Sequence, residues 1–400
     1  MNPTDAIDRT ITSKEDALID LRRHFHAHPE LSREEHETTR ELAHTLEEQG
    51  LRVTVSDDGL GLYADLEPAG GFDPTRHRTV AIRSDIDALA IVEETGLPFA
   101  SQNPGVMHAC GHDMHIACVT GAALALTDLR ADLPGRLRFV YQHAEEVAPG
   151  GALDMVRAGV MEGVDRILGL HCDPTMEVGT VGVRVGPFTA AADSFDLTIQ
   201  GTGGHSARPH EGVDTVFVAT RVIGDLYQAA SRLFDARSPI VIAVGSIHGG
   251  QTYNVIPDQV ALKGTVRSLD PNYRLKLREL FEQITAATCA TYGATYTLRF
   301  KHGAPAVIND ARVTDVIARV ASDLLGPDAV HTIPLPSMGA EDFSEFLQVV
   351  PGAMFRLGTL TPGAESHFLH SPRFNPDERA IAVGARILAR AALRLLSETS

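Results

Sequence analysis

The first part of the chain alternates short apolar runs, typical of buried strands, with segments of helical periodicity. Residues 32–35, Ser-Arg-Glu-Glu, have the form of a capping box that opens a helix, which Gly50 can end. A helix is expected from about His112 and a short one at Ala152–Ala158. The runs that predict strands are Leu51–Ser56, Gly61–Leu66, Thr79–Ile86, Leu137–His143 and Arg166–Leu170. Strands separated by helices predict an α/β fold, a mostly parallel sheet with helices on both faces.

The pattern changes near Phe188. A strand and a Gly-rich loop lead to a helix at Val213–Leu233, two more strands, a helix at about Pro271–Ala290 and a last strand. This order predicts a four-stranded antiparallel sheet with two helices on one face. The first pattern then returns and ends in a helix at Asp377–Leu395. We therefore expect a catalytic α/β domain from residues 1–187 and 303–400, interrupted by an inserted α+β domain at residues 188–302.

Composition narrows the possible partners. The 400 residues carry a net charge of −17 and are 44% hydrophobic, as expected of a soluble globular protein of two domains. The acidity and the lack of a basic stripe argue against a nucleic-acid partner. No apolar run is long enough to cross a membrane, and no signal segment precedes the first helix, so we expect a cytoplasmic protein.

Metal-capable side chains lie where these elements end. The set comprises Cys110 and His112 around Gly111, Glu145 and Glu146 after a predicted strand, His171 at the end of another, and His367 and His370 near the C-terminus. Thiolate and imidazole are good ligands for zinc-like ions. His115 is one helical turn beyond His112 and could lie on the same face. Paired carboxylates at a sheet edge divide naturally into a metal ligand and a proton carrier.

A rival interpretation makes Cys110 a catalytic nucleophile, with a base among His108, His112 and His115. Spacing alone does not exclude it. It gives no role to the paired glutamates or to the later histidines, whereas a metal centre uses them all. Each motif alone is ordinary, since most histidines at strand ends and most paired glutamates are structural or solvated. Their joint placement favours the metal centre.

The motifs together resemble a known family. The segments MHACGHDMHIA, HAEE, GLH, GGHSARPH, YNVIP, MGAEDF and LHSPRFN stand in the order and approximate spacing of the aminoacylase/carboxypeptidase family of metallopeptidases. The amidohydrolase branch, which includes hippurate and auxin-conjugate hydrolases, is the most similar. That branch shares Asp85-Ile86-Asp87 where most of the wider family has His-x-Asp, and it shares Cys110 where most have Asp.

The resemblance implies a two-metal site and roles for individual residues. The implied ligands are Cys110, His112, Glu146, His171 and His370. Glu145 would be the general base, and Asp87 would orient a residue of the metal site. His205, in the inserted domain, would polarise the scissile carbonyl, usually across a dimer interface. Asn254 and Arg267 would touch the substrate, Arg267 as the partner of a carboxylate. Soft sulfur favours zinc, cobalt or nickel, and manganese is also used in this branch.

The expected activity is hydrolysis of the amide bond of an N-acyl amino acid or a related conjugate, in a homodimer or higher homo-oligomer. A carboxypeptidase or dipeptidase acting on short peptides is the nearest alternative. A non-catalytic, metal-dependent binding module is a third, against which the retained pair Glu145 and Glu146 argues, because a binding protein needs no proton carrier.

Overall fold

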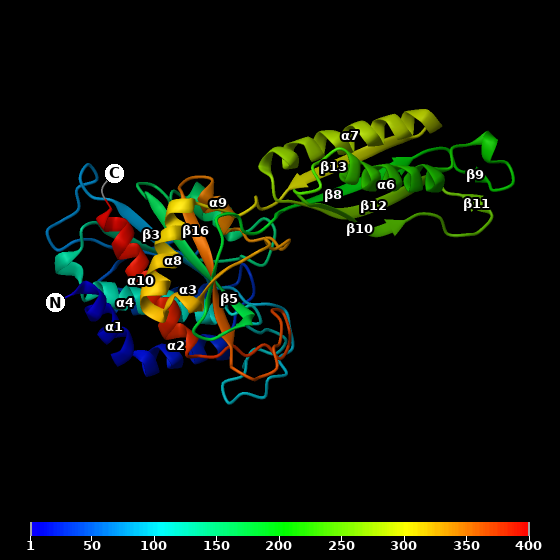
Figure 1. Ribbon diagram of the computed structural model, residues 1–400. Helices are drawn as coiled ribbons and strands as arrows, with labels where there is room; N and C mark the ends of the chain where they lie inside the picture. Colours follow the sequence, from blue (N-terminus) through cyan, green and yellow to red (C-terminus); the bar gives the residue numbers. More distant parts are fainter. Residues whose placement is uncertain (1, 399–400) are drawn as a thin grey trace. The chain divides into compact units, whose positions relative to one another are not determined.

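The computed structural model describes residues 2–398 and divides the chain into two compact units. Unit 1 comprises residues 1–188, 308–335 and 342–400, and unit 2 comprises residues 189–307 and 336–341. Figure 1 shows both units coloured along the chain. The chain thus leaves unit 1 after residue 188 and returns to it at residue 308, and the short segment 336–341 belongs to unit 2.

Unit 1 is built on an eight-stranded sheet in the order β1-β2-β4-β3-β5-β16-β6-β15. Its strands are β1 (Arg52–Val55), β2 (Leu62–Leu66), β3 (Thr79–Asp85), β4 (Arg136–Gln142), β5 (Arg166–Glu177), β6 (Val181–Val183), β15 (Val330–Thr332) and β16 (Gly352–Leu360). The four central strands, β4, β3, β5 and β16, run parallel, whereas β1 and β2 pair antiparallel at one side. A separate pair of short strands, β7 (Gly186–Pro187) and β14 (Ile308–Asn309), lies where the chain leaves and re-enters this unit.

The helices of unit 1 are α1 (Pro3–Ser13), α2 (Glu15–Ala27), α3 (His36–Glu48), α4 (His112–Thr127), α5 (Gly151–Arg157), α8 (Ala311–Leu325), α9 (Phe343–Leu347) and α10 (Ala380–Ser397). Helix α4 is apolar around almost its whole circumference because it lies between the sheet and the helices α1, α2 and α10. Figure 1 shows α4 and α10 together on one side of the sheet. The short helices α5 and α9 pack together over the opposite face, where Phe343 meets β5.

Unit 2 contains a four-stranded antiparallel sheet in the order β10-β12-β8-β13. Its strands are β8 (Ala191–Gln200), β10 (Ile240–His248), β12 (Gln259–Ser268) and β13 (Thr295–His302). Two helices, α6 (Thr215–Arg232) and α7 (Pro271–Tyr292), cover one face and form a core of their own with it. A two-stranded ribbon, β9 (Gly204–His205) with β11 (Val255–Ile256), completes the unit.

The predicted fold class is confirmed in both parts, the mostly parallel sheet between helices and the antiparallel sheet with two helices. The predicted capping box is wrong. Helix α3 begins at His36, and its first turn is capped by the carboxylate of Glu30, which accepts from the N–H groups of Glu37 at 3.1 Å and Thr38 at 2.7 Å. Ser32 instead donates its hydroxyl to Asp87, and the carboxyl of Glu35 accepts from the N–H of Ala144.

Candidate metal centre

The predicted ligands of unit 1 meet at the carboxyl edge of the central sheet. The register pairs Asp85 at the end of β3 with Gln142 at the end of β4, and it pairs Arg83 with Gly169, which places His171 of β5 at the level of Asp85. The loops that follow these strand ends carry the remaining side chains. This edge is where open α/β sheets bind their ligands.

His112, the first residue of α4, offers the clearest sign of a metal site. Its Nδ1 lies 2.9 Å from the backbone oxygen of Asp87 and 3.1 Å from Oδ1 of the same residue. A carbonyl oxygen only accepts, so Nδ1 must carry the proton and donate. The Nε2 atom is buried and has no hydrogen-bond partner within residues 2–398. An imidazole whose Nδ1 is fixed in this way directs its buried Nε2 as a metal ligand does, once the proton on Nε2 is released.

Cys110 and His171 complete one side of the cluster. The Nδ1 atom of His171 donates to the backbone oxygen of Cys172 at 2.8 Å, which leaves Nε2 3.5 Å from Sγ of Cys110. Burial, joined by the charge of Arg356, holds the pKa of His171 well below its ordinary value, so this imidazole is neutral and able to bind a cation.

The two neighbouring groups hold protons that a cation would have to displace. Burial raises the pKa of the Cys110 thiol well above its ordinary value. Burial also opposes the charged form of His112, but the charge of Asp85 and the hydrogen bond with Asp87 outweigh it and raise the pKa of that imidazole well above its usual range. A cation bound here would therefore release protons as it recruits these ligands.

Glu146 and His370 form the other side. Nε2 of His370 lies 3.2 Å from Oε1 of Glu146, and Nε2 of His112 lies 4.0 Å from the same oxygen. The N–H of Glu146 donates to Oδ2 of Asp87 at 3.0 Å. His370 sits at a positive φ of 66°, and its N–H donates to the backbone oxygen of Ala109 at 2.8 Å. The C-terminal loop is thereby tied to the turn that carries Cys110.

Two groups of ligand atoms result. Sγ of Cys110 lies within 4.8 Å of the nitrogens of His112 and His171, and it also lies within 4.8 Å of ligand atoms of Glu146 and His370. The two groups share the sulfur, an arrangement that could serve two neighbouring cations. Glu145 joins Glu146 and His112 in a third group of the same size. The structure thus brings together all five predicted ligands and the predicted base.

Asp87 lies behind this cluster and contacts two of its residues. Its carboxylate accepts from Nδ1 of His112, from the N–H of Glu146 and, at 2.6 Å, from the hydroxyl of Ser32. It is almost fully buried. Burial opposes its ionisation, but the hydrogen bonds from His112 and Ser32 outweigh that and lower its pKa. The ionised carboxylate therefore fixes a candidate ligand on each side of the site.

His115 has a different task from the one its spacing suggested. Its Nδ1 lies 2.6 Å from Oδ1 of Asp85, and its Nε2 accepts from the N–H of Cys172 at 3.0 Å. Both ring nitrogens are used, so His115 does not offer a lone pair to a cation. Asp85 in turn accepts from Arg83 at 2.9 Å. Asp85 and His115 together hold the backbone of Cys172, next to His171. The spacing of residues in the sequence did not indicate this role.

The predicted substrate residues all lie in unit 2. His205 is exposed on β9, opposite Val255 of β11, and the N–H of Ser206 donates to the backbone oxygen of Asn254 at 3.2 Å. His205 and Asn254 are therefore neighbours on one ribbon. Arg267 lies on β12 between Ala192 and Val241. The roles of His205, Asn254 and Arg267 stay predictions.

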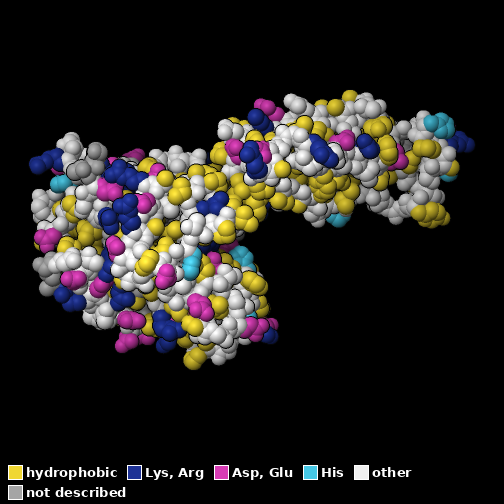
Figure 2. Space-filling view, in the orientation of Figure 1, with side chains coloured by type: hydrophobic (Ala, Val, Ile, Leu, Met, Phe, Trp, Pro, Cys, Tyr) yellow, Lys and Arg dark blue, Asp and Glu magenta, His cyan; other side chains and the backbone are white. Residues whose placement is uncertain are grey.

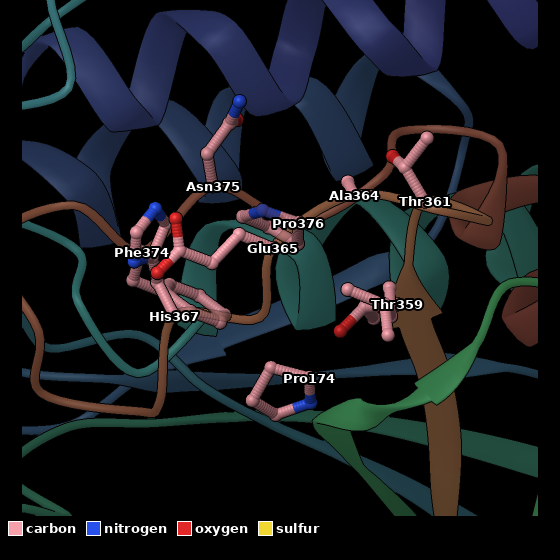
Figure 3. Close-up of a pocket in the computed structure, with 10 residues that line it drawn as sticks. Pro174, Thr359, Thr361, Ala364, Glu365, His367, Phe374, Asn375 and Pro376 are labelled. Carbon is pink, nitrogen blue, oxygen red and sulfur yellow. The ribbon is translucent and has the colours of Figure 1, made fainter.

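A separate pocket of about 290 Å³ lies near the end of β16. Figure 3 shows it between Thr359 on the strand and the following loop, which carries Glu365 and His367. Phe374 also lines it, and its ring lies 3.4 Å from the position that a β-carbon would take on Gly111. His367 thus belongs to this pocket and not to the ligand groups.

Comparison with known proteins decides the family. A profile described as peptidase family M20/M25/M40 matches residues 81–394. The chain belongs to peptidase family M20/M25/M40. The predicted resemblance is confirmed, and with it the class of metal-dependent hydrolases that act on amide bonds.

Several M20/M25/M40 relatives cover nearly the whole chain. An N-acetyl-L-cysteine deacetylase of Bacillus subtilis is 38% identical over 392 residues, which is 96% of this chain and 90% of the relative. Thermostable carboxypeptidase 1 of Saccharolobus solfataricus is 38% identical over 389 residues, 96% and 97% of the two chains. A solved structure described as a dinuclear metal-binding peptidase from Bacillus subtilis has a TM-score of 0.83 at 34% identity, over 97% of this chain and all of the other.

Within residues 2–398 no helix has the length and apolar character needed to cross a membrane. The cytoplasmic location stays a prediction.

Proposed function

We propose that this protein hydrolyses the amide bond of N-acyl amino acids with two divalent cations held by Cys110, His112, Glu146, His171 and His370. The observation that carries the proposal is the buried, unpartnered Nε2 of His112, which faces a thiol and a carboxylate. Thiol, imidazole and carboxylate together suit zinc, cobalt, nickel or manganese. When bound, such cations lower the pKa of a coordinated water toward about 7 and polarise the substrate carbonyl.

The side chains of unit 1 divide the remaining work. Glu145 stands beside the ligands without being needed as one, so its carboxylate can take the proton of the attacking water. The same carboxyl then gives that proton to the leaving amine nitrogen, which completes the cleavage. Asp87 keeps the proton of His112 on Nδ1 and holds the backbone of Glu146, so both ligands stay aimed at one place.

The substrate-binding part of the proposal rests on unit 2. A protonated or hydrogen-bonding imidazole of His205 would stabilise the oxyanion that forms as the carbonyl is attacked. Arg267 suits the carboxylate of an amino acid, because a guanidinium binds a carboxylate through two parallel hydrogen bonds. Asn254 adds an amide at the same ribbon as His205. Support for this comes from the motifs of the family, not from a contact with the metal centre.

The test is release of free amine from a panel of N-acetyl and N-benzoyl amino acids. We expect turnover by the metal-loaded protein, loss of turnover with a chelator, and recovery on adding metal back. Glu145→Gln should abolish turnover but leave metal content near that of the wild type. Glu47→Gln, an exposed glutamate on α3, is the matched control. If Glu145→Gln retains turnover, the assigned base is wrong, and if no substrate of the panel is cleaved, the proposal fails.

A carboxypeptidase activity on short peptides is the second candidate. It is favoured by the similarity to the carboxypeptidase of Saccharolobus solfataricus and by Arg267, which suits a C-terminal carboxylate equally well. Parallel assays with N-acyl amino acids and with dipeptides decide between the two. A ratio of kcat/KM that favours dipeptides would replace the first proposal with the second.

We further propose that the protein works as a homodimer through unit 2. Strand β10 is an outer strand of its sheet, with Val241 43% and Ile247 50% exposed. Figure 2 shows hydrophobic side chains along the β10 side of this unit. An exposed apolar edge strand favours pairing with another strand. If His205 acts on the partner's metal centre, a mixture of Glu145→Gln and His205→Ala chains should regain activity that neither has alone, and a consistently inactive mixture would contradict sharing.

A further inference from the structure

The turn between β4 and the two glutamates has an unusual backbone. Successive side chains of a strand point to opposite faces, so Glu145 and Glu146 could not both serve one site if the strand simply continued. Strand β4 ends at Gln142, and Ala144 then adopts a positive φ of 52°. This conformation is costly for a residue with a β-carbon and must be held by its surroundings.

The carboxyl of Glu35 restrains the backbone of Ala144. Its Oε1 accepts a hydrogen bond from the N–H of Ala144 at 2.7 Å. Both residues are completely buried, with 0% of their surface exposed, so water cannot take the place of the carboxyl. The hydrogen bond spans 109 positions of the sequence, from the start of α3 to the residue before the proposed base.

Burial of the Glu35 carboxyl lowers the stability of the folded protein. Burial raises its pKa to about 7, and the nearby charge of Asp87 adds to the effect. Its second oxygen, Oε2, is buried without a hydrogen-bond partner within residues 2–398. The helix does not use this side chain, since Glu30, and not Glu35, accepts from the N–H groups of Glu37 and Thr38 at its start. A buried acid that costs this much and serves neither its helix nor a salt bridge points to a task at the site.

The neighbouring residues support the same interpretation. Ser32, three positions earlier, donates its hydroxyl to Asp87 at 2.6 Å, and Leu31 forms a backbone bridge with Ala88. The loop before α3 therefore touches the supports of the metal centre at two points, Asp87 and Ala144. The sequence pattern that resembled a capping box belongs to this loop.

We infer that Glu35 is a positioning residue for Glu145. Its carboxyl holds Ala144 in the left-handed conformation, and that conformation directs Glu145 and Glu146 toward the same site. The inference rests on the proposed function for the role of Glu145, but the hydrogen bond to Ala144 and its effect on the backbone can be measured without catalysis.

The test compares four variants with the wild type in kcat, KM and amide hydrogen exchange at Ala144. Glu35→Ala removes the acceptor, whereas Glu35→Gln keeps an oxygen that can accept. Glu34→Ala removes an exposed glutamate at the adjacent position and is the matched control. Ala144→Gly, combined with Glu35→Ala, supplies a residue that adopts positive φ without steric cost.

We expect Glu35→Ala to lower kcat by about 100-fold, the scale of a misplacement of about 1 Å, with KM within about threefold. Exchange at Ala144 should accelerate, while exchange in α10 stays slow and shows that the variant is folded. Glu35→Gln and Glu34→Ala should remain near the wild type. The added Ala144→Gly should restore at least about tenfold of the lost kcat, because glycine needs less restraint.

The inference is overturned if Glu35→Ala keeps the wild-type kcat, or if exchange at Ala144 is unchanged. It is also overturned if Ala144→Gly restores nothing, since Glu35 would then act in some other way. These outcomes differ from a failure of the proposed function, which would show as an inactive wild type or an active Glu145→Gln variant. In that case the exchange measurement still decides whether Glu35 restrains Ala144.

Discussion

Asp87→Asn tests most directly whether Asp87 holds the proposed metal ligands His112 and Glu146 in place. The carboxylate of Asp87 accepts three hydrogen bonds, from Nδ1 of His112 at 3.1 Å, the N–H of Glu146 at 3.0 Å and the hydroxyl of Ser32 at 2.6 Å. Asparagine has the same shape but replaces one acceptor oxygen with a donor. The site contains no orientation of that amide in which all three donors are satisfied.

The two orientations fail in different ways. If the amide nitrogen takes the place of Oδ1, it meets the Nδ1 proton of His112, which the backbone oxygen of residue 87 keeps in place. If the nitrogen takes the place of Oδ2, it meets the N–H of Glu146, although the hydroxyl of Ser32 can rotate and accept. Each orientation loses a hydrogen bond to a charged acceptor, which is worth about 1.5–3 kcal/mol. At 1.4 kcal/mol per factor of ten, metal affinity should fall by about 10- to 100-fold.

The assay is competition for zinc against a chromophoric chelator at fixed pH. Ser32→Ala is the control, because it removes one donor and leaves the carboxylate to hold both ligands, so its affinity should change by less than about fivefold. Thermal unfolding of the metal-free variants verifies that they fold. If Asp87→Asn binds zinc within about twofold of the wild type, Asp87 does not hold the ligands in the way described.

Three further substitutions test the fold around the site. Gly111→Ala would place a β-carbon 3.0 Å from Sγ of Cys172 at a φ of 88°, so denaturant unfolding should show a loss of about 1–2 kcal/mol or more, and equal stability would contradict the strain. In the metal-free protein the folded pKa of Glu35, about 7, lies above the unfolded value of 4.5, so the wild type loses stability as pH rises through this window and Glu35→Gln does not. In denaturant unfolding, the free energy of unfolding of Glu35→Gln relative to the wild type should rise by about 3 kcal/mol between about pH 4.5 and pH 8. A difference that does not change with pH would refute the raised pKa of Glu35. Asp65→Ala leaves the buried Arg138 without its partner at 2.7 Å and should cost about 3–5 kcal/mol in denaturant unfolding, where a loss below about 1 kcal/mol would show that the pair is not needed.

The sequence predicted the architecture because its hydrophobic patterns are strongly periodic. The parallel strands β3 and β4 are buried along almost their whole length, and strand β10 of unit 2 alternates between half-buried and exposed residues. Each pattern follows from how many faces of the strand are covered. The grouping of Cys110, His112 and Glu146 could also be predicted, because these residues lie at or just beyond the ends of elements, and such ends meet at one edge of a parallel sheet. Strand β5 continues past the predicted end at Leu170 to Glu177, so His171 lies within it, and His370 lies in the loop between β16 and α10.

What the sequence could not show is which of several similar histidines keeps a ring nitrogen without a hydrogen-bond partner among residues 2–398. His112 and His115 are one turn apart and equally buried, but only contacts with Asp87, Asp85 and Cys172 separate a ligand from a support. Glu35 illustrates the same limit. Its local pattern predicted a helix cap, and the hydrogen bond that overrides this comes from a residue 109 positions away.

The central claim is that five side chains of unit 1 hold a pair of cations around the sulfur of Cys110. Its most direct test is the metal content of the dialysed, zinc-loaded protein, measured by elemental mass spectrometry beside Cys110→Ala and Cys289→Ala, the latter a buried thiol of unit 2. We predict about two zinc ions per chain for the wild type and for Cys289→Ala, and fewer than one for Cys110→Ala. A wild type that retains no zinc, or a Cys110→Ala variant that retains the full amount, would contradict the account.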